Sequence, residues 1–147
     1  MTIIVKDKLM KSLTKLPAKA LEYYINARRW KTHLDFFNIE VVFLNRIMEE
    51  HFLQLAGDNY KKKMTSLGSK LLVLMNEKYH VDGLLEQQLK KLELLAEGLP
   101  KESPDELAGK QAHLECHIID LIHEYREVKR ELYAIVEVVL NERKLLV

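Results

Sequence analysis

The fold is decided by residues 103–147, which read SPDELAGKQAHLECHIIDLIHEYREVKRELYAIVEVVLNERKLLV. Steps of alternately four and three residues from Leu107 meet side chains that can pack in a core, with Gln111 as the exception. The positions are Leu107, Gln111, Leu114, Ile118, Leu121, Tyr125, Val128, Leu132, Ile135 and Val139. A spacing that averages half of seven keeps one stripe of a helix facing its neighbours over many turns. The stretch therefore predicts one long helix of a bundle or coiled coil, over about residues 104–145.

A start signal precedes this helix in Ser103-Pro104-Asp105-Glu106. The Ser103 hydroxyl can accept a hydrogen bond from a free backbone N–H of the first turn, and Glu106 can reach back to complete a capping box. Pro104 fits the first helical position because its missing N–H would have no partner there.

The same stepping predicts two earlier helices, over about residues 17–56 and 59–97. In the first helix it meets Ala20, Tyr23, Ala27, Trp30, Leu34, Phe37, Val41, Leu44, Met48, His51 and Leu55. In the second it meets Tyr60, Met64, Leu67, Leu71, Leu74, Lys78, Val81, Leu85, Gln88, Leu92 and Leu95. Polar residues at such positions, here Lys78 and Gln88, can set the register between helices.

Glycines mark the limits of these helices. Gly57-Asp58-Asn59 separates the first two, and Gly98-Leu99-Pro100 ends the second with Gly98 in the left-handed conformation. Gly83 lies inside the second helix, where glycine costs about 1 kcal/mol relative to alanine. Because the stepping stays in register across Gly83, we expect a weak point or kink there and no break.

The first helix carries a second apolar stripe on its far side. Its members are Ile25, Phe36, Ile39, Phe43 and Leu53. One apolar seam needs one neighbour, whereas two stripes need cover on both sides. We therefore expect either the N-terminal arm, residues 1–16, or a second copy of the chain to cover this stripe.

These elements predict an all-α fold, an elongated antiparallel bundle of three long helices that forms a single domain over residues 17–147. Residues 1–16 are expected to form a short N-terminal helical arm. The composition agrees, because the 147 residues are 48% hydrophobic and 31% charged but include only 5 Gly and 3 Pro. Few turn-forming residues are typical of helices joined by few loops.

Charge and cysteine content limit the classes of partner. The chain has 23 Lys and Arg against 22 Asp and Glu, a net charge of +1, so no overall field attracts nucleic acid or an anionic membrane. The single cysteine, Cys116, excludes an internal disulfide and a site of several cysteines, which fits a reducing compartment. Without a signal peptide or a membrane-spanning run in the sequence, a cytoplasmic location is expected.

The histidines raise the question of a metal site. Glu77-Lys78-Tyr79-His80 has the Glu-x-x-His spacing that ferritin-like di-iron bundles use. Asp120 and His123 have the same spacing, with aspartate in place of glutamate. The candidate ligands of such a site are His33, Glu77, His80, His117 and Glu124, for Fe, Zn or Mn. The direction of the side chains counts against this site, because His80 and His123 point away from the apolar seams. No metal or other cofactor is therefore the primary expectation.

A second metal hypothesis uses His113 and His117, which lie four residues apart and can share a helix face. The third ligand would be His51, but His51 lies several turns from the level of His113. Cys116 is expected to be an inert thiol. The sequence contains no phosphate-binding glycine loop and no nucleophile or zinc-protease motif, so we expect no catalytic residues.

One stretch of the first helix resembles known proteins. It reads Trp30-x-x-x-Leu34-Asp35-Phe36-Phe37-x-x-Glu40-Val41-x-x-Leu44 and runs on to Glu49-Glu50. This pattern is similar to the opening helix of a loosely defined set of uncharacterised bacterial long-helix bundle proteins of similar size. The resemblance implies a long-helix bundle in a bacterial cytoplasm, and it implies no activity.

The sequence predicts a non-enzymatic helical bundle that acts through its surface, as a homodimer or by binding another protein through the second stripe of the first helix. The alternative is a metal-binding bundle, ferritin-like or with a single metal, that has redox or hydrolytic activity. A nucleic-acid accessory role is disfavoured by the near-neutral charge.

Overall fold

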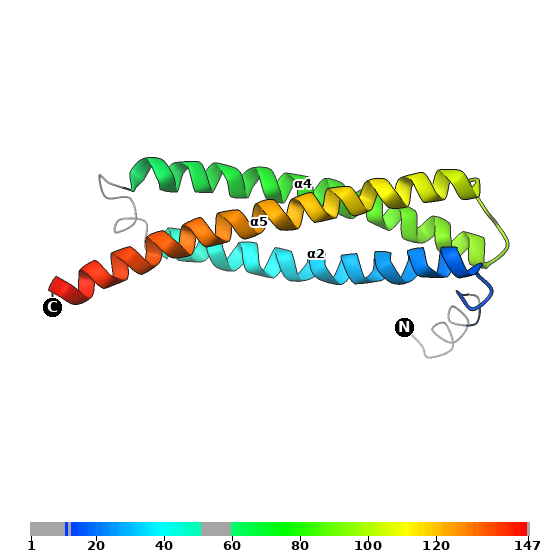
Figure 1. Ribbon diagram of the computed structural model, residues 1–147, viewed down its shortest axis with the longest axis horizontal. Helices are drawn as coiled ribbons and strands as arrows, with labels where there is room; N and C mark the ends of the chain where they lie inside the picture. Colours follow the sequence, from blue (N-terminus) through cyan, green and yellow to red (C-terminus); the bar gives the residue numbers. More distant parts are fainter. Residues whose placement is uncertain (1–10, 12, 51–59, 147) are drawn as a thin grey trace. The chain divides into compact units, whose positions relative to one another are not determined.

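The computed structural model describes residues 11, 13–50 and 60–146 and shows three helices (Figure 1). They are α2 (Ala18–Glu50), α4 (Lys61–Ala96) and α5 (Pro104–Leu146). The described residues include no strand, which confirms the all-α helical bundle. The predicted turn at Gly57-Asp58-Asn59 and most of the predicted arm, residues 1–16, lie outside the described residues.

The chain is divided into two compact units, each built from segments of all three helices. The first unit combines Met1–Leu34 with His80–Ile118, and the second combines Asp35–Tyr79 with Ile119–Val147. The single domain over residues 17–147 stays a prediction.

In the first unit, paired contacts define the directions of the helices. Lys31 of α2 donates to Glu86 of α4. Tyr24, which lies seven residues before Lys31, donates to Glu93, which lies seven residues after Glu86, at 3.4 Å. Partner numbers that run in opposite directions mean that these segments are antiparallel. The buried apolar side chains of this unit are Leu16, Ala20, Tyr24, Ala27, Leu34, Val81, Leu85, Leu89, Leu92, Ala96, Leu107, Leu114 and Ile118.

In the second unit, the ring of Phe37 on α2 packs edge-on against the ring of Tyr125 on α5, with 4.7 Å between centroids. The Nζ atom of Lys70 on α4 pairs with Glu131 on α5 at 3.6 Å. The buried apolar side chains are Phe37, Val41, Leu44, Met64, Leu67, Leu71, Leu74, Leu121, Tyr125, Val128, Leu132 and Ile135. Each large apolar side chain buried in this way stabilises the fold by about 1.5–3 kcal/mol.

The predicted seams agree with this burial to different degrees. On α5 every predicted position from Leu107 to Ile135 is buried, Gln111 included. On α2 the prediction is wrong at Tyr23, because Tyr24 is buried and Tyr23 is half-buried; Trp30 and Met48 are also half-buried. A helix has 3.6 residues per turn, so a strict repeat of seven drifts around the helix, and the phase of a seam can shift by one residue.

The helix ends have the predicted local structure. Gly98 has φ = 78°, and the Gly98 and Leu99 N–H groups donate to the carbonyls of Leu95 and Leu94 at 3.0 and 2.8 Å. These two bonds form a Schellman motif, which satisfies carbonyls at the end of α4. At the start of α5, the Ser103 hydroxyl accepts from the Glu106 N–H at 3.2 Å, as predicted.

Replacement of Gly83 and of Gly98 by alanine should change the free energy of unfolding in opposite directions. Gly83 is exposed inside α4, and an added Cβ would meet nothing within 4 Å. Gly83→Ala should raise the free energy of unfolding by about 0.5–1 kcal/mol, because alanine loses less backbone entropy in a helix. Gly98→Ala should lower it, since alanine is strained at positive φ. Urea denaturation followed by circular dichroism measures both; destabilisation by Gly83→Ala would contradict this account.

Candidate interaction surface

The exposed side of α2 in the second unit carries a group of large apolar side chains, which we call the α2 stripe. Its members and their exposed fractions are Phe36 at 60%, Ile39 at 65%, Val42 at 47% and Phe43 at 53%. These positions recur at helical spacing over two turns, so they share one side of the helix. Val42 was not predicted, although its place three residues after Ile39 is a usable signal.

The two other residues predicted for this surface, Ile25 and Leu53, are not part of the α2 stripe. Ile25 is 51% exposed on the segment of α2 that belongs to the first unit. Leu53 lies outside the described residues.

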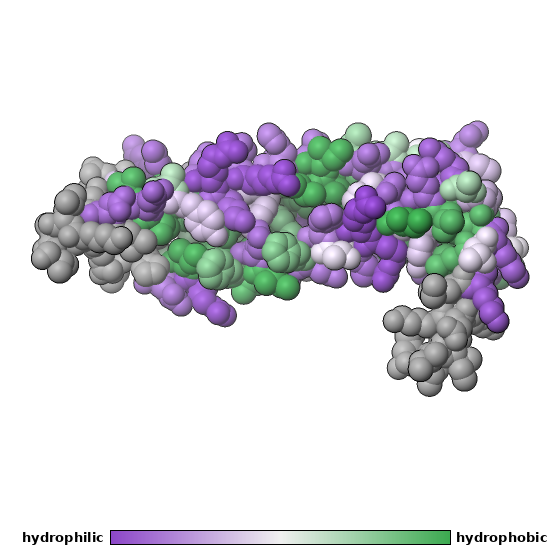
Figure 2. Space-filling view, turned by 60° about the horizontal axis from the view of Figure 1, so that its bottom comes forward, coloured by the Kyte–Doolittle hydropathy of each residue, from purple (hydrophilic) through white to green (hydrophobic). Residues whose placement is uncertain are grey.

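Figure 2 shows hydrophobic surface in separate patches among hydrophilic side chains. The other helices also expose large apolar side chains, for example Leu72 and Val73 on α4 and Ile119 on α5.

Of the two carboxylates next to the α2 stripe in sequence, Asp35 and Glu40, Glu40 is bound inside the second unit. Glu40 follows Ile39 directly, yet its Oε2 accepts from the Tyr125 hydroxyl of α5, and the Lys129 Nζ lies 3.3 Å from its Oε1. Burial and the bond to Glu40 raise the pKa of Tyr125 far above its usual value, so the phenol stays protonated and can donate. The negative charge of Glu40 is therefore compensated on the α5 side of α2.

Charged residues stand at the two ends of the α2 stripe. Asp35 precedes Phe36, and Arg46 follows Phe43 by one helical turn. Both side chains are exposed. The stripe is thus apolar in its middle, acidic at its N-terminal end and basic at its C-terminal end.

Three histidines of the first unit, all outside the predicted seams, lie close together. The Nε2 atoms of His113 and His117 on α5 are 3.0 Å apart, and the ring centroid of His80 on α4 is 6.4 Å from that of His117. His80 and His113 line one cavity of about 270 Å³. The sequence placed His80 and His117 in one metal hypothesis and His113 and His117 with His51 in another, and it did not predict that His80, His113 and His117 meet.

The remaining metal candidates are placed elsewhere. His33 is exposed on α2, Glu77 is exposed on the second unit's part of α4, and Glu124 lines a groove of the second unit beside His123. His51 lies outside the described residues. Within the described ranges, no group of three or more His, Cys, Asp or Glu side chains is placed so that it could hold a metal ion as it stands.

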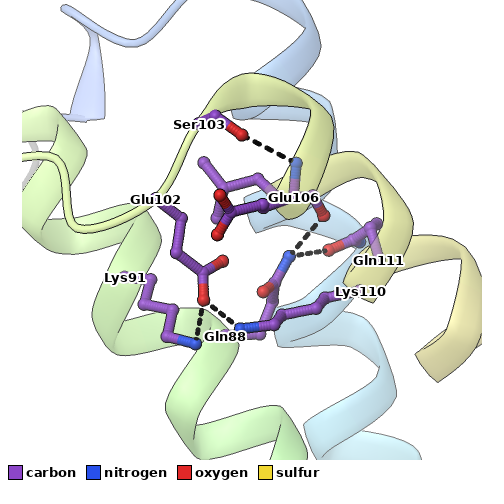
Figure 3. A network of polar contacts seen from close by, with 8 residues as sticks. Gln88, Lys91, Glu102, Ser103, Glu106, Lys110 and Gln111 are labelled. Carbon is purple, nitrogen blue, oxygen red and sulfur yellow. Dashed lines mark hydrogen bonds and ion pairs between the residues drawn. The ribbon is translucent and has the colours of Figure 1, made fainter.

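A polar network joins α4 to the connection that precedes α5 (Figure 3). One oxygen of Glu102 accepts from both the Lys91 and the Lys110 ammonium groups, although the Glu102 side chain is only 8% exposed. The hydrogen bonds from Lys110 and Lys91 lower the pKa of Glu102. Sequence reasoning missed Glu102, because it lies between helices where no period applies.

Buried amides continue this network towards α2. The Gln88 side chain, 2% exposed, donates to the Leu107 carbonyl and to Gln111 Oε1, both at 3.1 Å. Gln111 donates in turn to the Tyr23 carbonyl at 3.0 Å. Within the described residues, Gln88 Oε1 and Glu102 Oε2 are buried without a hydrogen-bond partner. Gln88 therefore connects α4 to α5, and Gln111 connects α5 to α2 within the first unit.

Neutralising Glu102 should destabilise the protein in a pH-dependent way. Glu102→Gln leaves Lys91 and Lys110 without their shared carboxylate, so the free energy of unfolding at pH 7 should fall by about 1 kcal/mol. A carboxyl with a lowered folded-state pKa stabilises above its unfolded pKa, 4.5, and loses that contribution as the pH falls further. The difference between wild type and variant should therefore shrink from pH 7 to pH 3. Urea denaturation at both values tests this, and a difference independent of pH would contradict it.

In the described part of the chain, no helix combines the length and the apolar character needed to cross a membrane. Comparison of the chain with protein-family models, with curated proteins and with solved structures found no match.

Proposed function

We propose that the protein is a non-enzymatic helical bundle that self-associates as a homodimer through the α2 stripe. The observation that carries this proposal is the exposure of Phe36, Ile39 and Phe43, each more than half exposed on two turns of one helix. Contiguous exposed apolar surface on a helix marks an interaction site more often than a free surface. Aromatic side chains at the centre of an interface also supply much of its binding energy.

The order of residues along the stripe favours an antiparallel pair. A two-fold axis near Ile39 places Phe36 opposite the partner subunit's Phe43, so the same surface is used twice. The exposed Asp35 then faces the end of the stripe that carries the partner subunit's Arg46. A parallel pair would instead bring the two aspartates together and the two arginines together, which is unfavourable.

We place this homodimer in the bacterial cytoplasm. Exposed Cys116 is a free thiol, which fits a reducing compartment, and the resemblance of the opening helix points to bacteria. A different protein with an apolar helix is the alternative occupant of the stripe. The experiments below distinguish it from a second copy.

A charge in the middle of the stripe should abolish the dimer. Ile39→Glu places two carboxylates at the two-fold axis, where burial of an unpaired charge is costly, so the chain should become monomeric. Sedimentation equilibrium of wild type and variant over a range of about 1–200 μM measures the change. Ile119→Glu is the matched control, because Ile119 is 58% exposed in the same unit but on α5. A wild-type chain that is monomeric throughout would contradict the homodimer and leave the N-terminal arm, residues 1–16, or a different protein as the occupant.

A charge exchange tests the antiparallel orientation. Asp35→Arg alone and Arg46→Asp alone should each weaken the dimer, because each creates like charges between subunits. The double variant should restore much of the affinity, since the attraction is re-formed with opposite sign. The dissociation constants of the four proteins, measured by sedimentation at low salt, give the coupling between the two sites. Additive effects of the two substitutions would exclude this contact.

A further inference from the structure

The geometry points to a zinc site on the first unit, formed by His113 and His117 of α5 and completed by His80 of α4. It is independent of the α2 stripe, which lies in the second unit. The site would bind Zn²⁺ or a similar divalent ion that prefers imidazole ligands.

His113 and His117 already have the arrangement of a chelating pair. Two histidines four residues apart on a helix can bind one zinc ion from the same side. Two nitrogens bound to one tetrahedral zinc ion at ~2.0–2.1 Å lie roughly 3.3 Å apart. The two Nε2 atoms are 3.0 Å apart, so little movement is needed to place an ion between them.

His80 supplies the third ligand from the neighbouring helix. Imidazoles that share one tetrahedral ion have ring centroids roughly 5 Å apart. The centroid of His117 lies 4.4 Å from that of His113 and 6.4 Å from that of His80. His80 is exposed, so a change of side-chain rotamer can bring its ring about 1 Å closer.

The cavity beside these rings suits the open position of such a site. His80 and His113 line it together with Gln88, so a water molecule at the fourth position of the ion has room there. Lys91 and Lys110 also line the cavity, but both are paired with Glu102, which reduces their repulsion of a cation.

Zinc titration of the full chain, purified without an affinity tag and freed of metal by dialysis against chelator and then against chelator-free buffer, tests the site. Isothermal titration calorimetry with ZnCl₂ should show one ion per chain. His113→Ala and His117→Ala should each weaken binding by at least about tenfold, because the chelating pair is lost. His33→Ala is the matched control, since His33 is an exposed histidine of the same unit on α2, and it should leave binding unchanged.

A second measurement tests the ligand from α4. Zinc should raise the thermal unfolding temperature of the wild type, because the ion joins α4 to α5 in the folded state only. His80→Ala should remove most of this shift and weaken binding severalfold. Unchanged binding in His113→Ala or His117→Ala, or absence of saturable binding, would overturn the site. An unchanged temperature shift in His80→Ala would overturn the role of His80. Circular dichroism shows whether each variant is folded. His113→Gln is a second substitution at the same position, in case His113→Ala does not fold.

Discussion

The structure depends on one constraint: each helix can bury its apolar stripe only against the other two. Helices of this kind gain most of their stability from packing and little from intrinsic propensity. The stripe of α5 is buried from Leu107 to Ile135, and it is matched by buried side chains of α4, mostly leucines, and by buried alanine, leucine, valine and aromatic side chains of α2. The capping bonds at Ser103 and Gly98 then set where helices begin and end within that packing.

The periodicity of the sequence was sufficient to predict the helices, most of the core and the exposure of Phe36, Ile39 and Phe43. A repeat of seven specifies which side of a helix is apolar, and α5 keeps that repeat without interruption. It does not specify the rotation of one helix against another. For that reason Tyr24 replaces Tyr23 in the core, and the approach of His80 to His117 could not be predicted from either helix alone.

The repeat also could not predict the positions of residues between the helices. Glu102 belongs to no repeat, yet it is buried and accepts from two lysines on different helices. Its partners are defined only once α4 and α5 are packed. The two units therefore differ in chemistry: the first contains the buried polar network and three neighbouring histidines, whereas the second exposes a large apolar surface on α2.

The bond between Tyr125 and Glu40 links the interior of the second unit to its outer surface. Glu40 is next to the most exposed isoleucine of α2, and a free carboxylate there would hydrate the flank of that surface. Because a phenol and an ammonium group of α5 bind this carboxylate, side chains of one helix determine how the charge beside the exposed apolar surface of another is compensated. Substitutions at positions 125 and 129 would therefore alter the hydration of the flank of the α2 stripe without changing any residue of the stripe itself.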